Sequence, residues 1–480
     1  MSDVRYASVL ELAAMVQDGE VTPVELVSGA LERIERLDPH VNAFIDVDGE
    51  RALRDAAGVK PGNGSPFAGV PIAIKNNVPV ADRPLTMASA LLDGYRAQHD
   101  AYLVRRLRAA GFVIVGLTNL PEFGILPTTE PRHTGVTRNP WDLSRTPGGS
   151  SGGSGAAVAA GMVPVAHGND GGGSLRIPAA CCGLVGCKPS RGRISRGPDL
   201  GDSFLGVEGV LTRDVADTAA LLDVLAGYEA GDSTWAPRPE EAFAVAAQRD
   251  PARLRIAVTT RNYQDAPVHP DLERALRDTA DALADLGHEV VEASPPMPAP
   301  EVLDLFISVF GPQISLGVLF AQSVAGRSAA DHELEPLTRA VFACANAVPS
   351  HGYLAAVARL QAMARTVVGF FADFDVLLTS TLAVPPLPIG ELHGCGTDPM
   401  EDLRRSGSFA PFTALFNVTG QPALTIPAGL MPDGLPASVQ LVGRPLGESV
   451  LLQLASQLER TQPWGGLRPA TPEMGEERMT

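Results

Sequence analysis

The sequence predicts an α/β protein in which helices cover a mostly buried β-sheet. Strand-like apolar runs alternate with helical patterns over the whole length, which is typical of this class. The 480 residues are 45% hydrophobic and 19% charged, so the chain can bury a large core. No internal repeat or long linker interrupts the alternation. We therefore expect a single domain spanning residues 1–480.

The N-terminal elements carry clear start and stop signals. The first forty residues read as two helices. Thr22–Glu25 begins the second of them, with Thr as N-cap, Pro at the first helical position and Glu three residues after the cap. A helix over Ala101–Ala110 stops at Gly111 and gives way to the apolar strand Phe112–Leu117. A helix beside a buried strand is the repeating unit of an α/β core.

The C-terminal half continues the alternation. Further strands are expected at Arg255–Thr259, Glu289–Ala293, Val376–Leu378, Ala423–Pro427 and Ser438–Val442, and helices at His269–Leu286 and Leu354–Phe371. Residues 229–253 are polar and Pro/Ala-rich, which indicates a surface excursion, and 294–300 form a stiff Pro-rich connection. We expect an inserted helical segment at about 301–370 and a loose tail over the last dozen residues.

Charge and cysteine content limit the partners and the location. A formal net charge of −17 argues against nucleic acid or an anionic membrane as partner, because both favour basic surfaces. The N-terminus lacks a charged segment followed by an apolar core, and no run of about 18 apolar residues is expected to span a membrane. The five cysteines have no zinc-type spacing: Cys181, Cys182, Cys187, Cys344 and Cys395. We expect a cytoplasmic protein without a metal site.

Two glycine- and serine-rich clusters and one lysine carry the chemistry. Pro147–Gly155 and Asp170–Pro178 place backbone N–H groups and hydroxyls together, as an oxyanion hole around a nucleophilic serine requires. The chain has three lysines, Lys60, Lys75 and Lys188, so arginine supplies nearly every cation. A desolvated lysine can lose its proton and arginine cannot, so Lys75, inside an apolar strand-like run, is a candidate general base.

Other interpretations of the glycine clusters fit the sequence less well. Gly148–Gly152 matches the Gly-x-Ser-x-Gly nucleophile elbow, but that turn follows an apolar strand, and Asn139–Thr146 is polar and turn-rich. No phosphate-loop pattern is present. A flexible linker is disfavoured by the helix-like Ala156–Ala160 between the clusters.

The chain resembles the amidase signature family over roughly residues 8 to 465. The motifs that carry the resemblance occur in the family's order: Gly69–Lys75, Gly116–Phe123, Arg138–Trp141, Gly148–Ser154, Asp170–Ala180, Gly183–Pro189 and Phe416–Ala423. The resemblance implies a single-domain amidase fold with a central mixed β-sheet covered by helices on both faces. It also implies a signature core at about 60–200 and a variable, substrate-shaping helical segment at about 301–370.

The resemblance implies a Ser–cisSer–Lys triad. Ser174 is the expected nucleophile, Ser150 the bridging serine and Lys75 the base; the two serines are 24 residues apart, as in the family. In the family the bridging serine follows a cis peptide bond, so Gly149–Ser150 is expected to be cis. No cofactor is required, because neutral Lys75 draws a proton through Ser150 from Ser174.

The second glycine cluster is expected to form the oxyanion hole. The N–H groups of Gly171, Gly172 and Gly173, with that of Ser174, would hold the developing charge. Asp170 and Arg176 are expected to brace the loop as structural supports. Departures from the usual family pattern leave the triad intact: Asn76, Gly171, Ser380 and Ala437–Ser438.

The predicted substrate is a neutral, hydrophobic amide, anilide or carbamate. Gly124 and Thr129 are the expected substrate-binding residues. The variable segment contains apolar residues that are expected either to shape the pocket or to pack on the core: Phe306, Phe310, Leu316, Phe320 and Phe342. The chain is also similar to members that hydrolyse nylon-type linear or cyclic oligoamides, to aryl-acylamidases and to urethanases.

Two further classes stay open. The chain could be the glutaminase subunit of a tRNA-dependent amidotransferase, although such members usually have Gln where this chain has Ile177. It could also be a silent scaffold, against which the intact triad argues. The expected partner is a small-molecule amide, and a homodimer is a possible assembly.

Overall fold

The computed structural model describes residues 4–62, 64–201, 203–297 and 301–470. Residues 471–480 of the predicted tail and 298–300 of the predicted Pro-rich connection lie outside this range.

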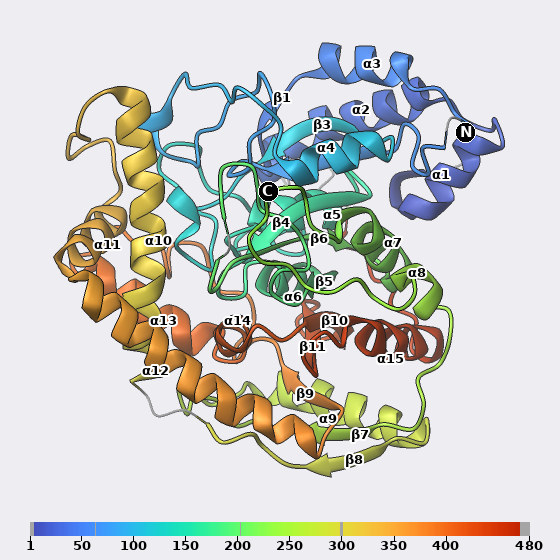
Figure 1. Ribbon diagram of the computed structural model, residues 1–480. Helices are drawn as coiled ribbons and strands as arrows, with labels where there is room; N and C mark the ends of the chain where they lie inside the picture. The colour runs from blue at the N-terminus through green and yellow to red at the C-terminus, as the bar shows by residue number, and fades with distance from the viewer. Residues whose placement is uncertain (1–3, 63, 202, 298–300, 471–480) are drawn as a thin grey trace, which may run out of the picture.

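Within the described residues, eleven strands form one mixed sheet in the order β1-β3-β2-β4-β6-β5-β10-β11-β9-β7-β8 (Figure 1). The strands are β1 (Phe44–Val47), β2 (Pro71–Lys75), β3 (Val113–Thr118), β4 (Val165–Asp170), β5 (Val185–Lys188), β6 (Val207–Thr212), β7 (Arg255–Val258), β8 (Glu289–Glu292), β9 (Val376–Ser380), β10 (Ala423–Leu430) and β11 (Pro436–Gly443). β2 runs parallel to β3 and β4, and β7 to β8 and β9, while the other neighbours are antiparallel. The expected mixed sheet is confirmed.

Helices cover both faces of this sheet. Alternate residues of β2 point to opposite sides, so Ile72 and Ile74 join one apolar cluster and Ala73 joins another. The first cluster includes residues of α1 (Val9–Gln17), α4 (Tyr102–Ala109), α7 (Val215–Leu225) and α15 (Glu448–Thr461). The second includes residues of α2 (Pro23–Val41), α3 (Gly49–Gly58), α5 (Gly152–Ala159) and α6 (Arg176–Cys182).

The local signals in the sequence place the N-terminal elements correctly. α2 begins at Pro23 with a capping box in which Thr22 accepts from the Glu25 N–H and the Glu25 carboxylate accepts from the Thr22 N–H. A second capping box between Ser8 and Glu11 begins α1. α4 and β3 confirm the helix and strand expected on either side of Gly111.

The C-terminal predictions are also confirmed within a few residues. β7, β8, β9, β10 and β11 occupy the expected strand positions, and α9 (Pro270–Asp285) and α12 (Ser350–Gly369) the expected helices. The excursion at 229–253 contains a short helix, α8 (Phe243–Ala246), and Phe243 is fully buried against the body. This anchor was not visible in the polar composition of the segment.

The inserted segment at 301–370 is helical, as expected, and consists of α10 (Val302–Ala325), α11 (Pro336–Ala347) and α12. With α13 (Pro399–Phe409) and α14 (Ala414–Thr419) it lies at one side of the sheet (Figure 1). Residues Val302–Ala325 and Ser350–Ala372 are long and apolar enough to cross a membrane by length and composition alone, with about a third of each buried. Polar residues interrupt the apolar run in both helices.

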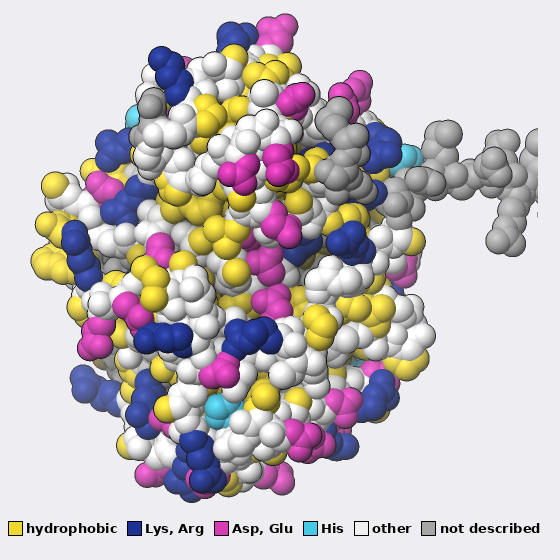
Figure 2. Space-filling model, turned by 90° about the vertical axis from the view of Figure 1, so that its right-hand side faces the viewer, with side chains coloured by type: hydrophobic (Ala, Val, Ile, Leu, Met, Phe, Trp, Pro, Cys, Tyr) yellow, Lys and Arg dark blue, Asp and Glu magenta, His cyan; other side chains and the backbone are white. Residues whose placement is uncertain are grey.

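Charged side chains are mixed on the surface. On the face shown in Figure 2, basic and acidic side chains are interspersed and no broad basic patch is seen.

Candidate active site

The candidate site lies at the carboxyl ends of two neighbouring parallel strands. β2 ends at Lys75 and β4 ends at Asp170, and the two strands pair directly. The serine clusters lie close to helix starts: Ser150 lies two residues before the start of α5, and Ser174 two residues before the start of α6. Residues that lie 24 to 99 positions apart along the chain therefore meet at one edge of the sheet, where ligand sites in open α/β sheets commonly lie.

Lys75 and Ser150 are in direct contact. Lys75 Nζ donates a hydrogen bond to Ser150 Oγ over 2.7 Å, and both side chains are buried. Burial lowers the pKa of Lys75 to about 7, although the charges of Glu208 and Asp170 raise it. Near neutral pH a large fraction of Lys75 is thus unprotonated and can accept a proton from Ser150.

The loop that carries Ser150 is tightly enclosed. The Gly149–Ser150 peptide bond is cis, as the resemblance implied. A Cβ atom at Gly152 would overlap Thr129 Oγ1, so no larger residue fits there without a shift of that side chain. The Thr129 hydroxyl donates to the Gly148 carbonyl over 2.9 Å. Thr129, expected to bind substrate, is fully buried and lies outside the cavity described below, so we assign it to holding this loop.

Ser174 is partly exposed and faces a cavity that also borders Gly124. A Cβ atom at Gly124 would lie 3.3 Å from Ser150 Oγ, so Gly124 places the cavity wall beside the bridging serine. Among the described residues, no hydrogen bond joins the hydroxyls of Ser150 and Ser174. The structure therefore brings Lys75 and Ser150 into contact and places Ser174 at the cavity.

Asp170 organises the oxyanion loop. Its Oδ1 accepts from the Gly173 N–H over 2.7 Å and its Oδ2 from the Leu175 N–H over 3.2 Å. The Gly173 N–H was expected to face the oxyanion, but Asp170 holds it instead. In the part of the chain that the structure describes, the N–H groups of Gly171, Gly172 and Ser174 have no such acceptor. These three N–H groups are therefore the candidates for an oxyanion hole.

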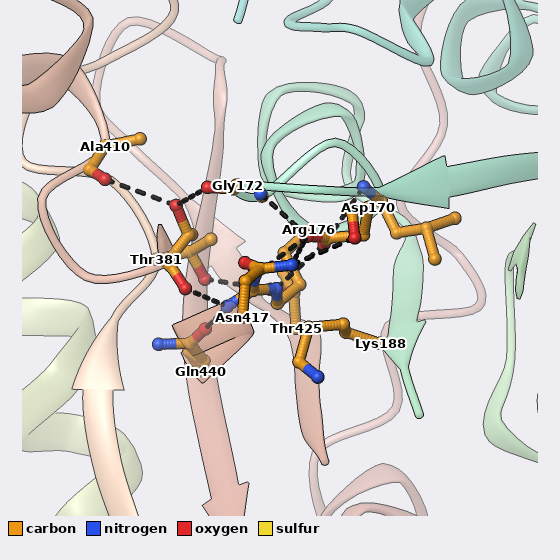
Figure 3. A network of polar contacts seen from close by, with 12 residues as sticks. Asp170, Gly172, Arg176, Lys188, Thr381, Ala410, Asn417, Thr425 and Gln440 are labelled. Atoms are coloured by element: carbon orange, nitrogen blue, oxygen red, sulfur yellow. Dashed lines mark hydrogen bonds and ion pairs between the residues drawn. The ribbon is translucent and has the colours of Figure 1, made fainter. Parts of the chain in front are cut away.

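Arg176 neutralises Asp170 within a fully buried network. Arg176 Nε lies 2.9 Å from Asp170 Oδ2. Burial raises the pKa of Asp170, but the charge and hydrogen bonds of Arg176 outweigh it and lower the pKa to about 2. The guanidinium also donates to Asn417 Oδ1 and Gln440 Oε1, both over 2.7 Å (Figure 3). The loop bearing Ser174 is thus tied to α14 and β11.

Replacing Arg176 with methionine is expected to destabilise the folded protein by about 3–5 kcal/mol, because Asp170 would stay buried without its cation. Chemical denaturation measures the loss. Adding Asp170→Asn to the same chain should recover part of it, since the uncompensated charge is then removed. A loss below about 1 kcal/mol in the single variant would contradict this role.

The cavity beside Ser174 is apolar and has a volume of about 80 Å³. Phe306 and Phe310 of α10 stack with their ring centroids 5.5 Å apart and line it. A Cβ atom at Gly172 would lie 3.2 Å from Phe306 Cζ, so the aromatic pair packs on the oxyanion loop. The other expected pocket residues lie elsewhere: Leu316 and Phe320 are exposed, and Phe342 is not part of the lining.

Sequence reasoning missed three features of this site. Asn169 Oδ1 accepts from Lys75 Nζ over 2.7 Å. Tyr263 contributes a phenol to the cavity wall. Lys188 is as buried as Lys75, and burial lowers its pKa to about 7 as well, but it donates to the Pro189 carbonyl. Burial of a lysine therefore does not by itself identify a candidate base. Contact with a serine distinguishes Lys75 from Lys188.

The described residues contain no cluster of three or more His, Cys, Asp or Glu side chains suited to a metal ion. His167, which lies near the loop, is buried and its Nε2 is 3.1 Å from Glu208 Oε2.

Comparison with known proteins agrees with this geometry. The amidase family matches residues 25–452. The 6-aminohexanoate-cyclic-dimer hydrolase of Paenarthrobacter ureafaciens is 40% identical over 472 residues, covering 95% of each chain. A solved 6-aminohexanoate cyclic dimer hydrolase complexed with substrate superposes with a TM-score of 0.92 at 38% identity, covering 98% of this chain and 100% of that one. A bacterial aryl acylamidase of the amidase signature enzymes superposes with a TM-score of 0.86 at 27% identity, covering 96% and 98%.

Proposed function

Because the chain belongs to the amidase signature family, we propose that it hydrolyses neutral hydrophobic amides, anilides or carbamates through an acyl-enzyme on Ser174. It is an amidase, a hydrolase of carbon–nitrogen bonds, and it binds a small amide substrate. The contact between Lys75 Nζ and Ser150 Oγ carries the proposal for the mechanism, since it joins a neutralised base to the bridging hydroxyl.

The first half of the reaction forms the acyl-enzyme. Neutral Lys75 takes the Ser150 proton while Ser150 takes the proton of Ser174, whose Oγ then attacks the carbonyl carbon of the substrate. The N–H groups of Gly171, Gly172 and Ser174 stabilise the oxyanion. When the tetrahedral intermediate collapses, the C–N bond breaks and the proton held by the Lys75–Ser150 relay passes to the leaving nitrogen.

The second half releases the acid. Water enters the site, and the relay, again neutral at Lys75, accepts its proton as the oxygen attacks the acyl carbon. Collapse breaks the ester bond to Ser174 and returns the proton to Ser174 Oγ. Hydrolysis of an amide gives a carboxylic acid and an amine. A carbamate cleaved at its C–N bond gives an amine and a carbonic acid monoester, and one cleaved at its C–O bond gives an alcohol and a carbamic acid.

The lining of the cavity supports a neutral substrate. Among the described residues that line it there is no Asp, Glu, Lys or Arg, and the polar side chains are Ser174, Tyr263 and Ser406. An ionic group would lose its hydration there without gaining a partner, which is costly. Hydrophobic contact with Phe306 and Phe310 would bind the acyl or aryl portion instead.

An oligoamide is the second candidate substrate. The relatives named above include hydrolases of the 6-aminohexanoate cyclic dimer, and 40% identity covers nearly the whole of both chains. The apolar lining of the cavity suits the polymethylene portion of such a substrate.

A substrate panel tests the proposal and separates the candidates. Purified protein is assayed on 4-nitroacetanilide, a 4-nitrophenyl carbamate, a cyclic oligoamide and glutamine, with Ser174→Ala and Lys75→Ala beside it. Turnover of the anilide or carbamate that both substitutions abolish would support the first candidate. Turnover of the oligoamide alone would favour the second, and turnover of glutamine alone would favour a glutaminase subunit. A cytoplasmic location and a homodimer stay predictions.

Replacing Phe306 with alanine is expected to raise KM for a hydrophobic substrate about tenfold, because a buried aromatic contact of roughly 1.5 kcal/mol or more is removed. Phe320→Ala is the matched control, since Phe320 lies on the same helix but is exposed and outside the cavity. Steady-state kinetics on long and short acyl substrates measure the effect. Equal changes in both variants would show that α10 does not shape the substrate site.

A further inference from the structure

Asn169 contacts the proposed base as closely as Ser150 does. Asn169 is the next-to-last residue of β4, and its Oδ1 accepts from Lys75 Nζ over 2.7 Å. Lys75 Nζ thus lies between two oxygen atoms, Ser150 Oγ on one side and Asn169 Oδ1 on the other, each at 2.7 Å.

We propose that Asn169 is a positioning residue that holds the Lys75 amine with its lone pair directed at the Ser150 hydroxyl. An amide oxygen can accept a hydrogen bond but never donate one. A neutral amine has two N–H groups and one lone pair. Once Asn169 Oδ1 takes one N–H, rotation about the terminal carbon–nitrogen bond is restricted, and the lone pair can face Ser150. The inference rests on the proposed relay from Ser174 through Ser150 to Lys75.

The other contacts of the Asn169 side chain support a role at the site. Its Nδ2 group has no acceptor among the described residues, and the residue is partly exposed. The side chain is therefore not a cross-link inside a closed buried network, in contrast to Asn417, whose Nδ2 and Oδ1 both bind the Asp170–Arg176 pair. Lys75 is the partner that the Asn169 side chain has.

The charges around Lys75 explain why an uncharged acceptor is suited to this position. Two carboxylates act on the amine through their charge and raise its pKa: Glu208, which pairs with Asn169 in the register of β4 and β6, and Asp170, the next residue of β4. Each has its own cation, Arg176 at 2.9 Å from Asp170 and Arg196 at 2.9 Å from Glu208.

Because of these pairs, both carboxylates stay ionised. Burial raises the pKa of Glu208, but His167 and Arg196 lower it to about 2, and that of Asp170 is also about 2. A third carboxylate at position 169 would have Lys75 as its direct partner and would keep the amine protonated. An amide supplies the hydrogen bond without that charge.

The test compares Asn169→Ala, Asn169→Asp and the control Asn346→Asp. Asn346 is exposed on α11, so its substitution adds the same charge far from the site. The readout is the second-order rate constant for fluorophosphonate labelling of Ser174 between pH 5.5 and pH 10, with thermal unfolding measured in parallel. Labelling needs no knowledge of the substrate.

We expect Asn169→Ala to slow labelling at pH 8 by about 10- to 100-fold, because the base loses its orientation. Asn169→Asp is expected to move the midpoint of the rising pH limb upward by one unit or more, with the rate recovering at high pH. Asn346→Asp should match the wild type. An unchanged rate in Asn169→Ala, or equal losses in both Asn169 variants without a shifted midpoint, would overturn the inference, since the latter indicates a merely structural role.

The labelling and hydrolysis experiments together distinguish failure of this inference from failure of the substrate proposal. Wild-type protein that is labelled at Ser174 but hydrolyses nothing in the panel would refute the substrate proposal and leave the role of Asn169 to be decided by the pH profiles. Absence of labelling in the wild type, with the protein folded, would overturn both.

Discussion

The Ser174→Ala variant is expected to lose about four to six orders of magnitude in kcat/KM, because no other group can form the acyl-enzyme and the activated nucleophile contributes that much in comparable hydrolases. The variant should fold normally, since Ser174 is partly exposed and its hydroxyl makes no hydrogen bond among the described residues. The measurement is hydrolysis of any substrate that the wild type turns over, together with mass spectrometry of the trapped acyl-enzyme.

The control for Ser174 is Ser308→Ala. Ser308 lies on α10 and its hydroxyl donates to the Asp304 carbonyl at the surface. That substitution should leave the activity within about twofold of the wild type. Retention of more than about one-thousandth of the activity in Ser174→Ala would show that another residue is the nucleophile.

The Lys75→Met variant is expected to lose about three to four orders of magnitude in kcat/KM at pH 8, because Ser150 and Ser174 then have no base. Methionine fills a similar volume and has no basic nitrogen to accept a proton. The pH profile gives a sharper result than the rate alone. Neutral Lys75 is the active form, and burial lowers its pKa to about 7, so wild-type kcat/KM should rise as pH increases through about 7 and level off above it.

The rise in kcat/KM near pH 7 should be absent from Lys75→Met. The pH dependence of its residual activity would reflect the hydroxide concentration or the titration of other groups. Lys60→Met is the matched control, because Lys60 is exposed. This variant should keep both the wild-type rate and the rise in kcat/KM near pH 7. A limb near pH 7 that survives in Lys75→Met would assign the titration to another group.

The local signals in the sequence predicted the elements of the fold well. The Thr22–Glu25 capping box and the stop at Gly111 depend on neighbours within a few residues, so they could be interpreted without the fold. The anchor at Phe243 could not, because its burial is against helices that lie elsewhere in the chain.

Some features of the candidate site could likewise be predicted from the sequence, and others depended on the fold. The motif order supplied Lys75, Ser150 and Ser174, and the structure placed the first two in contact over a separation of 75 residues. Sequence reasoning could not show that Asp170 takes the Gly173 N–H or that Thr129 supports a loop. Both facts depend on where backbone groups point after folding.

By itself, then, the sequence determined the α/β class and the positions of those helices and strands that carry local signals, and it supplied Lys75, Ser150 and Ser174 as candidates, because propensity, capping and motif spacing act over short distances along the chain. The tertiary structure alone shows which buried lysine contacts a serine, which N–H groups of the Ser174 loop have no acceptor among the described residues, and that Asn169 also contacts Lys75. These outcomes depend on contacts between β2, β4 and the loops that follow them, and on burial, which changes the pKa of a lysine only once the sheet and its helices have excluded water.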